Sequence, residues 1–254
     1  MKAWILAKKD LKVLFGSPLA YLILACFSFV SGYFFLSLVT QYQIFSLQAM
    51  QMQGIKNFNP QEWIIRPYLQ NSAILLLFFI PLITMRSFSE EKKLGTFELL
   101  LSYPVTELQI VLGKLLALAV FVGVALLLNA VGPILLFVYS APELGSTLGG
   151  YGGLFLLGLS FVALGVFLSS LTENQVVAAS LTFGALLVLW LLSWIKDLVA
   201  KQYQFVIKSC SLLAHFDSFA KGVITGTDLV YFVSFILFFI GLTLISLENQ
   251  RWRG

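Results

Sequence analysis

Side chains that could carry out chemistry are few in this sequence, and their spacing fits no metal site. The chain has one histidine, His215, and two cysteines, Cys26 and Cys210. Zinc sites need about three or four His, Cys or carboxylate ligands, usually in closely spaced pairs, so no metal site is expected. Cys26 lies in a long apolar run and Cys210 in a polar segment, so we expect no disulfide between them. His215 is interpreted as structural, with a ligand or pH-switch role as the alternative.

The motifs that bind nucleotides or activate a nucleophile are also missing. The nearest approach to a phosphate-binding loop is Gly113-Lys114, but Leu115 follows where Ser or Thr is needed, and Leu108 replaces the earlier glycine. The sequence contains no G-x-S-x-G or H-E-x-x-H motif. We therefore expect a chain that is not an enzyme and binds no cofactor itself. Any energy for work must come from a partner.

The composition places most of the chain in a lipid bilayer. Hydrophobic residues make up 59% and charged residues 11%, whereas soluble domains carry about 25% charged residues. The apolar residues come in runs of about 20, the length of a helix that crosses the hydrocarbon core, and not in the alternating pattern of barrel strands. The net charge of +4 suits lipid headgroups and membrane orientation, and nucleic acid is not an expected partner.

The apolar runs predict an all-α membrane protein with six transmembrane helices, in which residues 1–254 form a single transmembrane domain. The expected spans are 19–40, 68–85, 107–138, 150–171, 176–195 and 229–247. Gly132-Pro133 should kink the third span near its far end. No charged residue or histidine lies near the middle of any span. Ion-coupled carriers usually keep such residues there, so a self-sufficient carrier or channel is the least favoured function.

Basic residues indicate which side of the membrane each connection occupies. Ten of the sixteen Lys and Arg residues lie in the N-terminal arm, in the segment 86–114 and in the C-terminal tail. The positive-inside rule then makes both termini cytoplasmic, in an inner membrane of bacterial type. The N-terminal lysines before an apolar run could also belong to a cleaved signal peptide. The length of that run and the lack of a cleavage site favour an uncleaved helix.

Residues 1–18 are predicted to form an amphipathic helix that lies on the inner leaflet. At about 100° per residue, Lys2, Lys9 and Lys12 face away from one apolar sector. That sector contains Trp4, Ala7, Leu11, Leu14 and Phe15. Leu6 and Val13 fall on the polar side, which indicates that other parts of the protein cover them. A frayed basic N-terminus is the alternative.

The segment 86–106 between the second and third spans carries the most informative pattern. Ser87 and Glu90 have the spacing of a capping box that opens a short helix, and Gly95 is placed to end that helix. Thr96 can cap a second short helix with Phe97, Leu100 and Leu101 on it. Pro104 breaks the chain, and Thr106 with Gln109 forms a further capping box that opens the third span.

These signals predict a cytoplasmic helical elbow between the second and third spans. Its apolar side chains could enter a groove on a partner, inside a charged rim. The rim would consist of Glu90, Glu91, Lys92, Lys93 and Glu98. A solvated connector is the alternative, but two capping boxes, a glycine and a proline favour ordered structure.

The run from Phe88 to Thr106 resembles the E-(R/K)-x-x-G-T-x-E-x-L-L-x-x-P-(V/I) signature of ABC-2 type permeases. It reads Phe-Ser-Glu-Glu-Lys-Lys-Leu-Gly-Thr-Phe-Glu-Leu-Leu-Leu-Ser-Tyr-Pro-Val-Thr and continues to Gly113-Lys114. Residues 80–86 and 215–231 are similar to the gliding-motility and copper-processing branch of that superfamily. The similarity follows nearly the whole chain in order.

The resemblance implies a six-helix permease half, a second half of the same or a related chain, and a cytoplasmic ATPase under each half. ATP and magnesium would bind to that ATPase. By the same resemblance, the elbow that couples to the ATPase would contain Glu90, Glu91, Gly95, Thr96, Phe97, Glu98 and Pro104. No substrate-binding residue carries over.

The sequence thus favours the membrane subunit of an ATP-driven exporter. The alternative is a mechanical or scaffold subunit for motility or envelope assembly, which transports nothing. The external loop 196–228 could fold back on the bundle as a gate or bind an accessory protein outside the cytoplasm. Neither that loop nor any other segment reads as a separate domain.

Overall fold

A computed structural model gives the structure of residues 2–51, 59–98, 105–140, 142–195 and 211–251, and every regular element in these ranges is a helix. The first half contains α1 (Lys2–Gly16), α2 (Pro18–Gln51), the π-helical turn η1 (Gln61–Ile65), α3 (Arg66–Thr84), α4 (Ser89–Lys93) and α6 (Glu107–Asn129). The second half contains α7 (Val131–Tyr139), α8 (Leu144–Leu171), α9 (Gln175–Ile195), α11 (Leu212–Ala220) and α12 (Gly226–Arg251).

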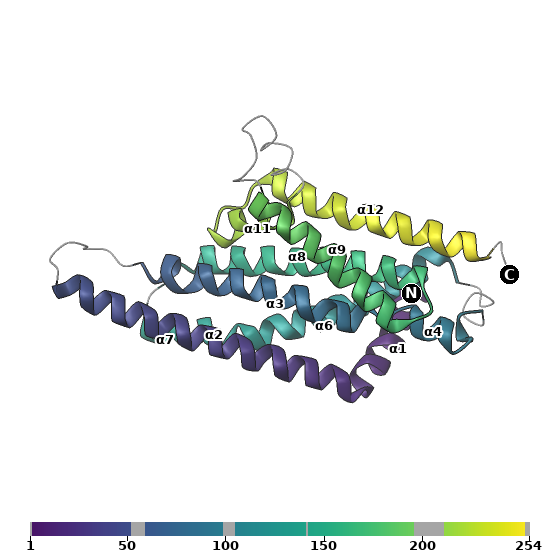
Figure 1. The fold of residues 1–254 in the computed structure, drawn as a ribbon, viewed down its shortest axis with the longest axis horizontal. Coiled ribbons are helices and arrows are strands. Elements are labelled where there is room, and N and C mark those ends of the chain that lie inside the picture. Colours follow the sequence, from purple (N-terminus) through teal and green to yellow (C-terminus); the bar gives the residue numbers. More distant parts are fainter. Residues whose placement is uncertain (1, 52–58, 99–104, 141, 196–210, 252–254) are drawn as a thin grey trace.

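Six helical segments are long and apolar enough to cross a membrane, which confirms the six predicted spans. They are Pro18–Gln48, Gln61–Lys93, Glu107–Tyr139, Leu144–Leu171, Gln175–Ser193 and Gly226–Gln250. Their helices run alongside one another, and the start of α1 and the end of α12 lie at the same end of the bundle (Figure 1). We refer to this as the terminal end. It also holds α4, whereas α11 lies at the opposite end (Figure 1).

The helix α8 forms the centre of the bundle, where it packs against α3, α6, α9, α11 and α12. Two glycines let neighbouring helices approach it. A Cβ atom at Gly165 would lie 2.3 Å from the Thr84 hydroxyl of α3, and one at Gly158 would lie 2.9 Å from Val122 of α6. In contrast, α2, α9 and α12 leave large apolar side chains exposed, and a bilayer or a second chain would cover these surfaces.

The third span is interrupted near its far end, as the sequence predicts. The break falls at Ala130, between α6 and α7, three residues before Pro133. Proline has no N–H to donate to the carbonyl four residues earlier, which is that of Asn129. The Tyr68 hydroxyl donates to this carbonyl instead, at 2.7 Å. The backbone group that Pro133 leaves unpaired is therefore satisfied from α3.

Uncharged polar groups extend this contact between α3, α6 and α8. The buried Asn129 side chain donates to the Ser72 hydroxyl at 3.0 Å and accepts from the Tyr151 hydroxyl at 2.9 Å. Ser72 in turn donates to the Tyr68 carbonyl at 2.8 Å. All four groups have partners, as buried polar groups in a low-dielectric interior require.

Part of the predicted loop 196–228 folds back on the bundle. Residues 196–210 lie outside the described part, but 212–220 form α11, which packs against α8. Asp217 of α11 bonds to Arg66 of α3 at 2.9 Å and to Lys221 at 2.7 Å. The His215 Nδ1 lies 2.6 Å from Asp228, and its ring stacks on Tyr231 at 4.0 Å between centroids. These contacts support a structural role for His215.

Candidate functional site: a clamped elbow at the terminal end

The chain between α3 and α6 forms an ordered elbow at the terminal end. A turn over residues 85–88 leads into α4, a second turn at Leu94-Gly95 ends it, and residues 96–98 are again helical. Gly95 has a φ of +68°, a conformation that glycine adopts without the strain other residues suffer. The predicted glycine stop is therefore confirmed. The capping box of Thr106 and Gln109 at the start of α6 is confirmed as well.

The predicted capping box of Ser87 and Glu90 is wrong. The helix α4 begins one residue later than that box predicts, at Ser89, and its N-cap residue Phe88 provides no side-chain cap. The cap comes from α8, since the Ser169 hydroxyl accepts from the backbone N–H of Phe88 at 3.1 Å and of Ser89 at 3.2 Å. A hydroxyl from a helix 80 positions later thus does the work of a local capping residue.

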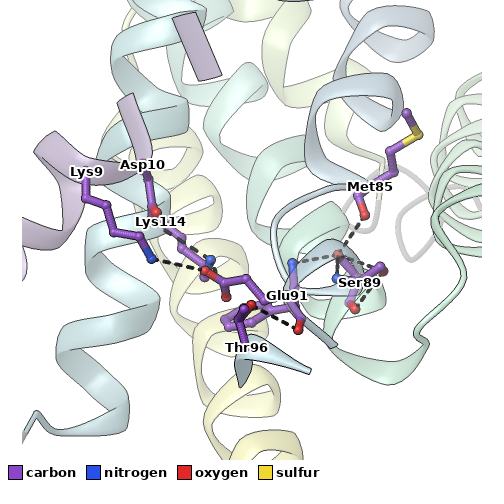
Figure 2. A network of polar contacts seen from close by, with 9 residues as sticks. Lys9, Asp10, Met85, Ser89, Glu91, Thr96 and Lys114 are labelled. Carbon is purple, nitrogen blue, oxygen red and sulfur yellow. Dashed lines mark hydrogen bonds and ion pairs between the residues drawn. The ribbon is translucent and has the colours of Figure 1, made fainter. Parts of the chain in front are cut away.

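The same hydroxyl ties the end of α3 to the elbow. Ser169 donates to the Met85 carbonyl at 3.1 Å, and the Ser89 hydroxyl lies 3.1 Å from the carbonyl and from the hydroxyl of Ser169 (Figure 2). Beside it, the Ser170 carbonyl accepts from Lys92 of α4 and, at 3.0 Å, from Gln250 of α12. The last turn of α8 therefore joins α3, α4 and α12.

A charged cluster, which we call the Lys114 cluster, fixes the other face of the elbow. The Lys114 ammonium lies 2.8 Å from Glu91 of α4 and 3.9 Å from Asp10 of α1. The Lys9 ammonium lies 3.5 Å from the other oxygen of Glu91 (Figure 2). The Lys114 side chain is only 6% exposed, so Glu91 and Asp10 supply charges that compensate a buried cation.

Aromatic rings complete the base of the elbow. Phe88 is fully buried, and its ring meets that of Phe97 edge to face at 6.2 Å between centroids. The Lys114 ammonium lies 4.8 Å from the centre of the Phe88 ring, and the Lys92 ammonium lies 5.5 Å from that of Phe97. Both distances are short enough for cation–π attraction.

Burial divides the predicted elbow residues into two groups. Glu91 and Phe97 point inward, so neither belongs to an outward rim or fills a groove on a partner, as the sequence pattern had indicated. Gly95, Thr96 and Glu98 are exposed, and Glu90 is half-buried. Among the described residues of the elbow, Leu94 projects an apolar side chain outward, at 67% exposure. Pro104, Leu100 and Leu101 lie outside the described residues.

The helix α1 is held against α6 by a close backbone contact. A Cβ atom at Gly113 would lie 2.8 Å from the Cβ of Leu6 and 3.2 Å from the Ala3 carbonyl. The prediction that protein covers Leu6 is therefore confirmed, but Val13 is 61% exposed and is not covered. Trp4 is 63% exposed, free for contact with lipid.

Burial also sets the charge balance of the Lys114 cluster. It raises the pKa of the Asp10 carboxyl above its usual range, and the nearby Lys114 charge offsets only part of this effect. Ionised Asp10 is therefore held at some cost in free energy. Among the residues with described positions, no three His, Cys, Asp or Glu side chains lie close enough together to hold a metal ion.

Sequence reasoning missed Ser169, Asp10 and the inward orientation of Glu91. One available signal was Lys114, a lysine placed inside an apolar helix, because buried charges are rarely left unpaired. Its partners had to come from acidic residues at the same end of the bundle.

Comparison with known proteins identifies the family. The family model described as ABC-2 family transporter protein matches residues 4–251, which include the elbow and all six spans. No curated protein matches the chain at a significant level. On the strength of the family match, which covers nearly all of its length, the chain belongs to the ABC-2 family of transporter proteins.

Proposed function

We propose that this multi-pass membrane subunit couples ATP hydrolysis by a separate ATP-binding subunit to the export of a substrate. In this proposal the terminal end faces the cytoplasm of a bacterial-type cell. The distribution of basic residues supports that orientation, since ten of the sixteen Lys and Arg residues belong to the N-terminal arm, the segment 86–114 and the C-terminal tail of the sequence. ATP and magnesium bind to the partner, and this chain supplies the moving part in the membrane.

The observation that carries the proposal is the division of the elbow into an exposed tip and a clamped base. The tip consists of Lys93, Leu94, Gly95 and Thr96, all exposed. Its apolar Leu94 next to charged and polar groups suits a groove on another protein. The base contacts α1 and α6 through Glu91 and contacts α8 through Ser169. A push on the tip therefore reaches three helices of the bundle.

The bundle gives such a push a path to the membrane interior. The Lys114 cluster links the elbow to α6, and the Ser169 contacts link it to α8, the most enclosed of the six spans. Closure of the partner on ATP would shift the elbow and, with it, the balance between inward-facing and outward-facing states. The central packing at Gly158 and Gly165 favours movement of helices as rigid bodies.

We further propose that two such chains, or this chain and a related one, form the complete membrane unit. The weak enclosure of α2, α9 and α12 supports this, because an isolated half leaves these helices largely uncovered. The segments 80–86 and 215–231 favour the gliding-motility and copper-processing branch of the family. An accessory protein on the outer side is compatible with the fold-back of α11.

The test measures the ATPase rate of the complex recovered from native membranes in mild detergent. We expect a protein with a Walker A motif to copurify with this chain. Its ATPase rate in the complex should differ from the rate of the isolated ATPase. Leu94→Asp should weaken recovery of the partner. Glu91→Lys should keep membrane insertion, but it places a second ammonium group beside buried Lys114, so it should release the elbow from α6 and uncouple the ATPase rate. Val223→Asp, an exposed position between α11 and α12, is the matched control for Leu94→Asp. Normal coupling in Glu91→Lys would contradict the proposal.

A transport assay separates export from the mechanical alternative. The close packing around α8 is the observation that favours the mechanical function, because force transmission needs no open path for a substrate through the bundle. Vesicles that contain the full complex are loaded with candidate substrates and given ATP. Flux that depends on ATP and is lost in Glu91→Lys supports export. Coupled ATP hydrolysis without flux of any candidate supports the mechanical subunit.

A further inference from the structure

A cavity of about 600 Å³ opens beside the elbow at the terminal end. Its volume falls within the range of about 300–1,000 Å³ that is typical of small-molecule sites. The walls come from α1, the start of α2, the end of α3, α4 and α6. Exposed Val13, Gly16 and Leu94 lie among the lining residues and mark its mouth.

The walls change from polar to apolar in the same direction on three helices. On α6, Lys114 comes first and Ala117 and Leu118 follow deeper in the bundle. On α2, Ser17 just before the helix is followed by Leu19, Ala20 and Ile23. On α3, which runs the opposite way, Ile83 precedes Arg86. A ligand that fits these walls has a polar head toward the terminal end and an apolar tail toward the membrane centre.

The polar wall contains one cation that the described part of the chain leaves without a carboxylate partner. Arg86 donates to the Ser17 hydroxyl at 3.2 Å, and its Nε atom is inaccessible to solvent and has no hydrogen-bond partner. No described carboxylate lies within 4.0 Å of it, in contrast to Lys9 and Lys114, which both pair with Glu91. The Arg86 side chain is half-buried. A partly buried guanidinium group without an anion is costly, and a phosphate fits its planar array of donors.

The same wall contains an acidic group outside the ion pairs. Glu90 lines the cavity four residues after Arg86, but no described cation lies within 4.0 Å of its carboxylate. A ligand with an anionic group beside Arg86 and an ammonium group beside Glu90 would give each of these side chains an ion-pair partner. Free phosphate or a nucleotide would leave the apolar wall unused, and a fatty acid would leave Glu90 unused.

We propose that this cavity binds the head group of one zwitterionic phospholipid, with its phosphate on Arg86, its amine on Glu90 and an acyl chain along Leu19, Ala20 and Ile23. The cavity holds the head group and the beginning of one chain, and the rest of the lipid stays in the adjacent leaflet. This lipid contacts both α1 and the elbow, so its occupancy would stabilise the contact between them. The inference depends on neither the export proposal nor the identity of the partner.

The test measures phospholipid binding to the full chain purified in detergent and stripped of lipid. Short-chain phosphatidylethanolamine, phosphatidylglycerol and inorganic phosphate are added in turn, and binding is followed by thermal unfolding and native mass spectrometry. We expect one phosphatidylethanolamine to bind and stabilise the fold, phosphatidylglycerol to bind more weakly, and inorganic phosphate to have no effect. Equal effects of inorganic phosphate and lipid would overturn the proposal.

Two variants locate the site. Arg86→Gln should weaken binding of phosphatidylethanolamine roughly tenfold or more, since a hydrogen bond to a charged group is lost. Glu90→Gln should reduce the preference for phosphatidylethanolamine over phosphatidylglycerol, a change that a purely structural role would not produce. Lys12→Gln removes an exposed cation of α1 outside the cavity and is the control. The proposal would be overturned if both cavity variants bound phosphatidylethanolamine as tightly as the parent and kept the parent's preference for it over phosphatidylglycerol. If Arg86→Gln does not fold, the Glu90→Gln preference decides alone.

Discussion

Replacing Glu91 with Gln tests whether the Lys114 cluster holds the elbow in place. At an effective dielectric constant of about 20, the attraction of Lys114 to Glu91 at 2.8 Å is about 6 kcal/mol, and that to Asp10 at 3.9 Å is about 4 kcal/mol. Loss of one partner of a buried ion pair costs about 3–5 kcal/mol net. Because Asp10 remains, we expect Glu91→Gln to lower the free energy of unfolding by about 2–3 kcal/mol.

Two further variants make this prediction specific. Asp10→Asn is the same kind of change beside the same lysine. Burial raises the pKa of Asp10, so the ionised carboxylate is already costly in the folded state. Loss of this charge should therefore leave the free energy of unfolding at neutral pH nearly unchanged. The double variant Glu91→Gln/Lys114→Met removes the uncompensated cation and should recover roughly half of the loss or more.

The assay is chemical unfolding in mixed detergent micelles, followed by tryptophan fluorescence, with all variants at one pH and salt concentration. The reasoning is refuted if Glu91→Gln unfolds like the parent. It is also refuted if the effects of Glu91→Gln and Lys114→Met simply add, because the two side chains would then not interact.

Three other predictions concern the contacts around the elbow and at the opposite end. Ser169→Ala removes the acceptor of two elbow N–H groups and should lower the free energy of unfolding by about 1–2 kcal/mol. The control is Ser160→Ala, which changes a buried serine bonded only within α8 and should lower it less. Chemical unfolding in micelles measures both variants. Gly113→Ala places a Cβ atom 2.8 Å from the Cβ of Leu6 and should loosen the contact of α1 with α6, which limited proteolysis would detect as faster cleavage. Gly152→Ala, at a position with open space, is the control. Burial raises the pKa of Asp217, but hydrogen bonds from a lysine and an arginine outweigh it and hold the pKa below its usual range. The folded state therefore releases the proton more readily, so the stability that separates the parent from Asp217→Asn should be complete at neutral pH. It should begin to decrease below about pH 4, the usual carboxyl value, and vanish only below the lower pKa of the folded state.

The features that could be predicted from the sequence are those set by short stretches of chain. Each span is a run of apolar residues whose length alone fits the bilayer, so hydropathy finds it without knowledge of its neighbours. Gly95, Pro133 and the Thr106–Gln109 box act on backbone groups within four residues of themselves. All of them were confirmed, although the break before Pro133 starts at Ala130.

The features that could not be predicted depend on distant parts of the chain. The Ser87 cap fitted the local pattern, yet the N–H groups at the start of α4 bond to Ser169 because α8 brings its hydroxyl there. Similarly, a charged residue on a five-residue helix can face outward or inward. Glu91 faces inward because Lys114 is buried beside it, a fact that spacing along the chain does not contain.

The central claim is that the elbow tip contacts an ATP-binding partner. Photocrosslinking in native membranes tests it most directly, with a benzophenone maleimide attached to Leu94→Cys in a variant whose Cys26 and Cys210 are replaced by Ser. Val223→Cys between α11 and α12, also exposed, is the control. The account predicts that Leu94→Cys, and not Val223→Cys, crosslinks to a protein that mass spectrometry identifies by its Walker A motif. A crosslink to that protein only from Val223→Cys, or labelling of Leu94→Cys by a membrane-impermeant maleimide added to intact cells, would contradict it.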